Sequence, residues 1–127
     1  MPIALPEINT EFLTGFLTRL LNTPSPTGYA VQAIMLTREA LEELGGLSLS
    51  CNRKGALLAE WPGKSDTAPR GLTAHADTLG AMVKEIKPNG RLRLTQIGSY
   101  AWNTVEGEGT TVFFREGTIH PRIDPAQ

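Results

Sequence analysis

A histidine and an aspartate, two positions apart, are the residues of this chain with the clearest potential for chemistry. His75 and Asp77 lie in the segment Gly71–Val83. Residues i and i+2 of a β-strand project from the same face, so both side chains can serve one site. A histidine that binds a metal usually has a carboxylate nearby that fixes the orientation of its ring. A triplet of this kind also arises by chance, so the elements around it decide how it is interpreted.

The segment that carries the pair is expected to be a strand of an α/β fold. Gly71 to His75 is a nearly continuous apolar run, which is typical of strands buried on both faces of a sheet. Two helices are expected earlier in the chain, because apolar residues recur there at helical spacing. The first begins at a cap formed by Asn9 or Thr10, and the second extends from about Tyr29 to Leu44. The second helix is expected to bury Val31, Ile34, Met35, Leu41 and Leu44.

Alternating apolar and polar residues predict several short strands. The expected strands are Leu47–Cys51, Ala56–Trp61, Ala81–Ile86, Arg91–Ile97 and Thr110–Phe114. Lys87–Gly90, between the third and the fourth of them, is a strong hairpin signal. The tail Ile119–Gln127 departs from this β pattern, and we expect it to be an irregular end, as a truncation or a frameshift would produce.

The predicted secondary structure changes near Leu79–Gly80, from mixed helix and strand to strands alone. Residues 1–79 are therefore expected to form an α/β part of the fold. Residues 80–127 are expected to begin a β-rich insertion or second domain.

The overall composition excludes several classes of partner. A formal net charge of −1 gives no bulk attraction to nucleic acid or to an anionic membrane surface. No apolar run approaches the ~20 residues that a membrane span requires. The first residues lack the features of a signal peptide, and the single cysteine, Cys51, cannot form an internal disulfide. We therefore expect a cytoplasmic protein.

Four segments, in the same order, resemble one family of enzymes. Pro24–Tyr29 resembles a "PSPTGYE"-like turn, and Asn52–Leu57 looks like the hairpin that follows it. Ala74–Val83 closely matches the segment "AHxDxxGxMV". Gly90–Trp102 resembles the start of a β domain inserted in the catalytic domain. The family is that of the glutamyl or deblocking aminopeptidases of the tetrahedral type, which are co-catalytic metallopeptidases of clan MH.

This resemblance implies a fold and a chemistry. The fold would be the N-terminal part of a phosphorylase/peptidase-like α/β/α catalytic domain, running into the start of the inserted β-rich domain. His75 would be a ligand in a site for two divalent ions, zinc or cobalt, and Asp77 would be its catalytic orienting partner. Such ions polarise the scissile carbonyl and activate a water, and a glutamate serves as general base. The substrate would be a peptide, and the enzyme a homo-oligomer.

The resemblance also implies that the site is incomplete, because the family's other ligands and its general base lie beyond the inserted domain. The local candidates to replace them are Glu106, Glu108, His120 and Asp124. None of these residues stands in a ligand-spaced pattern, so we expect them to be solvated. Ala30 and Thr78 replace residues that are usually acidic in the family, which leaves the substrate preference open.

Two hypotheses follow for the function. The chain is the N-terminal segment of a metal-dependent aminopeptidase and is inactive in isolation, because it lacks the base. Alternatively, it is a non-catalytic truncated remnant or a protein-interaction module, since a sheet that is cut short presents open edges to other chains.

Overall fold

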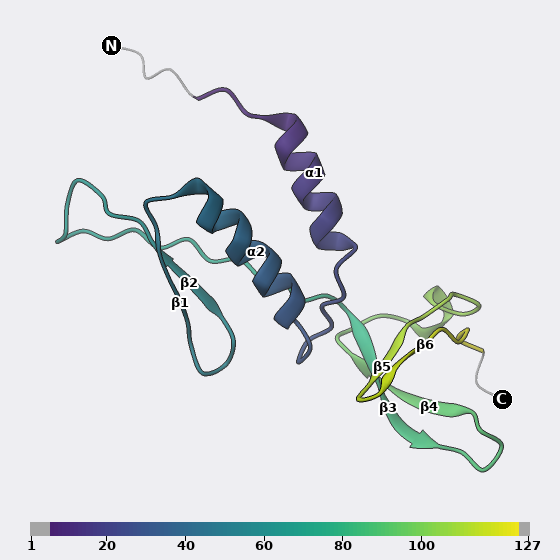
Figure 1. Ribbon diagram of the computed structural model, residues 1–127. Helices are drawn as coiled ribbons and strands as arrows, with labels where there is room; N and C mark the ends of the chain where they lie inside the picture. Colours follow the sequence, from purple (N-terminus) through teal and green to yellow (C-terminus); the bar gives the residue numbers. More distant parts are fainter. Residues whose placement is uncertain (1–5, 125–127) are drawn as a thin grey trace. The chain divides into compact units, whose positions relative to one another are not determined.

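The computed structural model describes residues 6–124, and the chain divides into the units Met1–Gly80 and Ala81–Gln127. The elements, labelled in Figure 1, are α1 (Thr10–Leu21), α2 (Val31–Leu44), β1 (Ser48–Cys51), β2 (Leu57–Glu60), β3 (Gly80–Ile86), β4 (Leu92–Ile97), the 3-10 helix η1 (Trp102–Thr104), β5 (Val112–Phe114) and β6 (Gly117–Ile119). The strands pair within residues 6–124 as three two-stranded sheets, β1–β2, β3–β4 and β5–β6. None of the helices in that range is long and apolar enough to cross a membrane. The expected assignment of residues 1–79 to a catalytic domain and of 80–127 to an insertion stays a prediction.

Helix α1 begins where its capping residue predicts. The side-chain oxygen of Asn9 accepts a hydrogen bond from the N–H of Phe12 at 2.9 Å, which satisfies one of the free donors of the first turn. The rings of Phe12 and Phe16 stack with centroids 6.2 Å apart. Nevertheless, Phe12, Leu13 and Leu17 are each about half exposed. Local signals thus form the helix, while the described residues leave part of its apolar face uncovered.

Helix α2 starts two residues later than expected and is buried less than expected. It ends at Leu44, and Gly45, which caps it, has a φ of 69°. Ala33 is the one residue of the helix that is fully buried, whereas the side chains of Val31, Met35 and Leu44 are exposed. The prediction that these three would be buried is wrong for the described residues. Helical spacing identifies an apolar face, but burial depends on the elements that pack against it.

The hairpin β1–β2 agrees with the sequence prediction. Its strands are antiparallel, with Ser48 opposite Glu60 and Cys51 opposite Leu57. In the turn, the side-chain oxygen of Asn52 accepts hydrogen bonds from the N–H groups of residues 54 and 56, at 2.9 and 3.0 Å. An aspartate or asparagine side chain that mimics the backbone in this way stabilises a turn locally.

The hairpin β3–β4 in the second unit also agrees with the sequence. Gly90 has a φ of 80°, which suits glycine in the turn. The N–H of Lys87 donates to the carbonyl oxygen of Arg91 at 2.8 Å. Across the two strands, the guanidinium of Arg93 lies 3.2 Å from the carboxylate of Glu85.

The expected irregular tail is wrong as far as Ile123. Strand β6 pairs antiparallel with β5, and Gly109 and Arg122 form a further antiparallel bridge. The N–H of Ile123 donates to the carbonyl oxygen of Glu108 at 3.0 Å, and the carbonyl oxygen of Pro121 accepts from Thr110 at 3.0 Å. Proline lacks an N–H, so a tail that contains prolines does not resemble a strand in its sequence. The carbonyl oxygen of a proline can still accept a hydrogen bond from a neighbouring strand. Residues 125–127 of the tail lie outside the described residues.

The expected buried strand at Gly71–His75 is also wrong in the described structure. The segment has no regular secondary structure, and the side chain of Leu72 is 98% exposed. A parallel strand depends on hydrogen bonds from neighbouring strands, since it has no local partner. Within residues 6–124, the backbone pairing next to this segment is the single parallel bridge between Pro26 and Thr78. An apolar run alone therefore does not make a strand here.

Candidate metal-binding site

A turn after α1 supplies one side of the site. The carbonyl oxygen of Pro26 accepts a hydrogen bond from the N–H of Tyr29 at 2.7 Å. Gly28, between them, has a φ of 92°, a conformation that favours glycine. Thr27 is exposed on this turn. The Pro-Thr-Gly sequence therefore fixes the backbone from which the Thr27 hydroxyl projects.

The same turn lies alongside Thr78 and Gly80. The N–H of Thr78 donates to the carbonyl oxygen of Ser25 at 2.8 Å, and Pro26 forms the parallel bridge with Thr78. Ser25 is 1% exposed, and its hydroxyl lies 3.5 Å from that of Thr78. A Cβ at Gly80 would lie 2.5 Å from the Cβ of Pro26, so a side chain there would force the backbones apart. Residues 25–26 and 78–80 thus pack closely, although about fifty positions separate them in the sequence.

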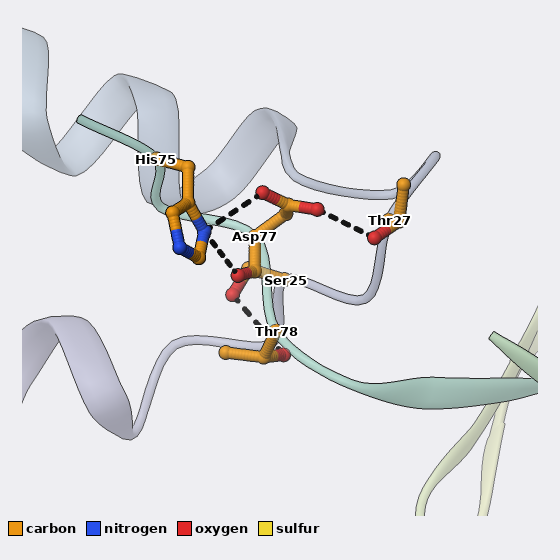
Figure 2. A network of polar contacts seen from close by, with 5 residues as sticks. All are labelled: Ser25, Thr27, His75, Asp77 and Thr78. Atoms are coloured by element: carbon orange, nitrogen blue, oxygen red, sulfur yellow. Dashed lines mark hydrogen bonds and ion pairs between the residues drawn. The ribbon is translucent and has the colours of Figure 1, made fainter. Parts of the chain in front are cut away.

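His75 and Asp77 point toward one another, as Figure 2 shows. The Nδ1 atom of His75 lies 3.1 Å from Oδ1 of Asp77 and 3.1 Å from the Asp77 carbonyl oxygen. The other carboxylate oxygen of Asp77, Oδ2, accepts a hydrogen bond from the hydroxyl of Thr27 at 2.5 Å. The pair predicted to serve one site is therefore together, even though its segment is not a strand.

The electrostatics define which nitrogen of His75 is available. The hydrogen bond from Thr27 lowers the pKa of Asp77 below its ordinary value, partial burial opposes this, and the contact with His75 lowers the pKa further. An ionised carboxylate can only accept hydrogen bonds, so this contact favours the tautomer of His75 in which Nδ1 carries the proton. Nε2 lies on the side of the ring away from Asp77, and the side chain is 84% exposed. Its lone pair is then available to a cation.

The other candidate ligands do not complete this site. In the part of the chain that the structure describes, no three side chains of His, Cys, Asp or Glu gather where they could hold a metal ion. Glu106 and Glu108 are exposed. His120 contacts the hydroxyl of Thr111 at 3.2 Å, and Asp124 lies 3.4 Å from the guanidinium of Arg91. A catalytic zinc takes about three protein ligands, whereas this arrangement offers one candidate ligand, His75, with Asp77 beside it.

Sequence reasoning missed the residues that support His75 and Asp77. Thr27 and Ser25 lie in Pro24–Tyr29, a segment whose residue types do not by themselves indicate a site. No pattern of spacing links them to Asp77 and Thr78, because the contacts are made by the fold. The available signal in the sequence is a proline-rich turn that carries two hydroxyl side chains, those of Ser25 and Thr27.

Comparison with known proteins places this chain in a family. A family model described as M42 glutamyl aminopeptidase matches residues 55–125. The protein named "Putative aminopeptidase YhfE" from Bacillus subtilis (strain 168) is 45% identical over 104 residues, which cover 82% of this chain and 30% of that protein. The crystal structure of the TET aminopeptidase from the marine sediment archaeon Thaumarchaeota archaeon SCGC AB-539-E09 has a TM-score of 0.78 at 20% identity, covering 92% of this chain and 32% of that one.

These similarities differ in what they show. At 20% identity, the structural match shows that the mixed helix and strand fold is that of the TET aminopeptidase. The chain spans less than a third of the length of either relative. The family model matches more than half of this chain, including His75 and Asp77. The resemblance found in the sequence is confirmed: the chain belongs to the M42 glutamyl aminopeptidase family.

Proposed function

We propose that this chain supplies a metal-binding half-site to a metal-dependent aminopeptidase. The observation that supports the proposal is the orientation of His75. Its Nδ1 faces the ionised Asp77, and its Nε2 is exposed. Metal-binding histidines in proteins are commonly held in this way by a carboxylate.

Each residue has a defined task in this proposal. His75 donates the lone pair of Nε2 to a divalent cation. Asp77 accepts a hydrogen bond from Nδ1–H, which fixes the tautomer and the ring orientation and makes the Nε2 lone pair a stronger donor to the cation. When bound, two divalent ions such as zinc or cobalt would polarise the scissile carbonyl of a peptide and lower the pKa of a water.

We infer that the remaining ligands and the general base come from polypeptide other than residues 6–124, since no three side chains of His, Cys, Asp or Glu in that range gather where they could hold a metal ion. We therefore propose that the 127-residue chain alone does not hydrolyse peptides. Peptide substrates, a homo-oligomeric assembly and a cytoplasmic location belong to the same proposal, and membership of the family supports the first of them. Hydrolysis of an aminoacyl-p-nitroanilide with zinc, cobalt or manganese, by a polypeptide that spans the whole family fold, tests the activity.

Zinc titration tests the half-site directly. We expect weak binding by the wild-type chain, because one histidine provides one ligand, and we expect the His75→Ala variant to lose it. The other histidine of the chain provides a matched control, since His120→Ala should bind zinc as the wild type does. Calorimetry gives the affinity, and the ring signals in NMR spectra identify which histidine responds.

Two results would contradict the proposal. Binding that survives in His75→Ala, or that depends on His120, would show that His75 is not the ligand. Tight binding by the isolated chain would show that a complete site exists within it.

A non-catalytic interaction module is a second candidate, which a specific observation supports. The described residues contain one buried hydrophobic residue, Ala33, and many exposed large apolar ones. Such surfaces are typical of sites that contact another protein. A chain that binds no zinc through His75 but forms a stable complex with another protein would favour this candidate.

A further inference from the structure

We propose that Thr27 is a positioning residue of the half-site: its hydroxyl holds the carboxylate of Asp77, and Asp77 in turn holds the imidazole of His75. The consequence for metal binding rests on the proposed function. The geometry of the three side chains stands on its own.

The two oxygens of the Asp77 carboxylate have separate partners. Oδ2 accepts from the Thr27 hydroxyl at 2.5 Å, and Oδ1 lies 3.1 Å from Nδ1 of His75. The last torsion of an aspartate side chain is broad, so one partner alone would leave the carboxylate free to rotate. With both oxygens engaged, the plane of the carboxylate is fixed, and Oδ1 is directed at the ring (Figure 2).

The Thr27 hydroxyl is well suited to this task. A distance of 2.5 Å between a hydroxyl and an ionised carboxylate is typical of a charge-assisted hydrogen bond. Threonine is branched at Cβ, which restricts its first torsion. The backbone that carries it is fixed as well, because the adjacent Pro26 forms the bridge with Thr78. The hydrogen bond between Thr27 and Asp77 therefore forms with little loss of conformational entropy.

The turn after α1 is held against Thr78 by contacts that do not involve the side chain of Thr27. The N–H of Thr78 donates to the carbonyl oxygen of Ser25, and the buried Ser25 hydroxyl faces that of Thr78. Thr27 itself is exposed. Removing its hydroxyl should therefore release Asp77 and leave the turn in place, which separates a positioning role from a structural one.

The tautomer of His75 tests the proposal. At about pH 8.5, where histidine is neutral, long-range ¹H–¹⁵N spectra distinguish a proton on Nδ1 from one on Nε2. We expect mainly the Nδ1–H form in the wild-type chain and in Thr27→Ser, which keeps the hydroxyl. Thr27→Val keeps the shape but not the hydroxyl, and should shift His75 toward the Nε2–H form that free histidine prefers.

Matched controls separate this effect from a change in fold. Thr67→Val removes the hydroxyl of another exposed threonine, which contacts Ser65, and should leave His75 unchanged. His120 serves as an internal reference in the same spectra. Far-ultraviolet circular dichroism should show the same helix content in every variant.

Zinc binding supplies the second readout. Residues that hydrogen-bond to a metal-bound histidine typically contribute 10- to 100-fold in metal affinity. Thr27 contacts Asp77 and not His75 itself, so we expect a smaller effect: Thr27→Val should weaken His75-dependent zinc binding by roughly threefold to tenfold. Thr27→Ser should restore the affinity.

The two proposals fail in different ways. An unchanged tautomer in Thr27→Val overturns the role of Thr27, even if His75 binds zinc. A wild-type chain whose His75 is mainly in the Nε2–H form overturns it without any variant. If the tautomer shifts as expected but His75 binds no zinc, Thr27 positions the pair and the proposed metal function is wrong.

Discussion

At the scale of single residues, the chain shows how a carboxylate becomes a rigid support for a histidine. Asp77 has one partner for each oxygen, and its hydrogen bond with Thr27 is the main cause of its lowered pKa. The ionised form is the one that both partners favour. The contacts among Thr27, Asp77 and His75 therefore depend on a charge that is present throughout the neutral range.

This charge predicts a dependence on pH. The pKa of Asp77 in the folded chain lies below its ordinary value of 3.8, so the contact stabilises the fold above that value and is lost as the pH falls through the lowered pKa. We expect Asp77→Asn, which keeps the shape but not the charge, to be less stable than the wild type at neutral pH and to lose less stability on acidification. Urea unfolding at several pH values checks this. Parallel curves for the two proteins would contradict it.

At the scale of elements, the contact between the turn and the segment after Asp77 requires a residue without a side chain. At Gly80, a Cβ would lie 2.5 Å from that of Pro26, whereas at Gly71 it would meet nothing within 4 Å. Overpacking of this kind typically costs about 1–3 kcal/mol. We expect Gly80→Ala to lower the free energy of unfolding by that amount, and the control Gly71→Ala to change it little. Equal effects in urea unfolding would show that the close packing is not needed.

The elements that could be predicted from the sequence are those whose signals are local. Asn9 caps α1, and Asn52 organises the turn between β1 and β2, each within a few positions of its partners. The errors concern pairing over long distances. Gly71–His75 has no neighbouring strand among the described residues, and the tail gains its order from residues 107–110. No local pattern contains that information.

In the candidate site, too, the local contact could be predicted from the sequence and the long-range contact could not. His75 and Asp77 could be predicted because they are two positions apart, and they contact each other whether or not the segment is a strand. Thr27 could not be predicted, since fifty positions separate it from Asp77. The sequence also offered Glu106, Glu108, His120 and Asp124 as candidate ligands, but in residues 6–124 no three side chains of His, Cys, Asp or Glu gather where they could hold a metal ion.

At the scale of the whole molecule, the chain buries little apolar surface. Ala33 is its buried hydrophobic residue within residues 6–124, while Leu13, Leu17 and Leu21 on α1 are between 47% and 66% exposed. Monomeric proteins rarely expose large apolar patches, and exposed ones favour association.

We therefore expect the isolated chain to associate as its concentration rises and to bind a hydrophobic dye such as ANS. Replacing Leu13 and Leu17 together by glutamine should weaken both effects, because burying one such side chain contributes about 1.5–3 kcal/mol. Helix α1 should persist in this variant, since glutamine is a good helix former and the two side chains are half exposed. Arg19→Gln, an exposed change on the same helix, is the matched control.

Sedimentation velocity over a range of concentrations measures the association. A wild-type chain that stays monomeric and binds no dye would mean that these apolar side chains cover one another in solution, and the half-site would then belong to a self-sufficient domain.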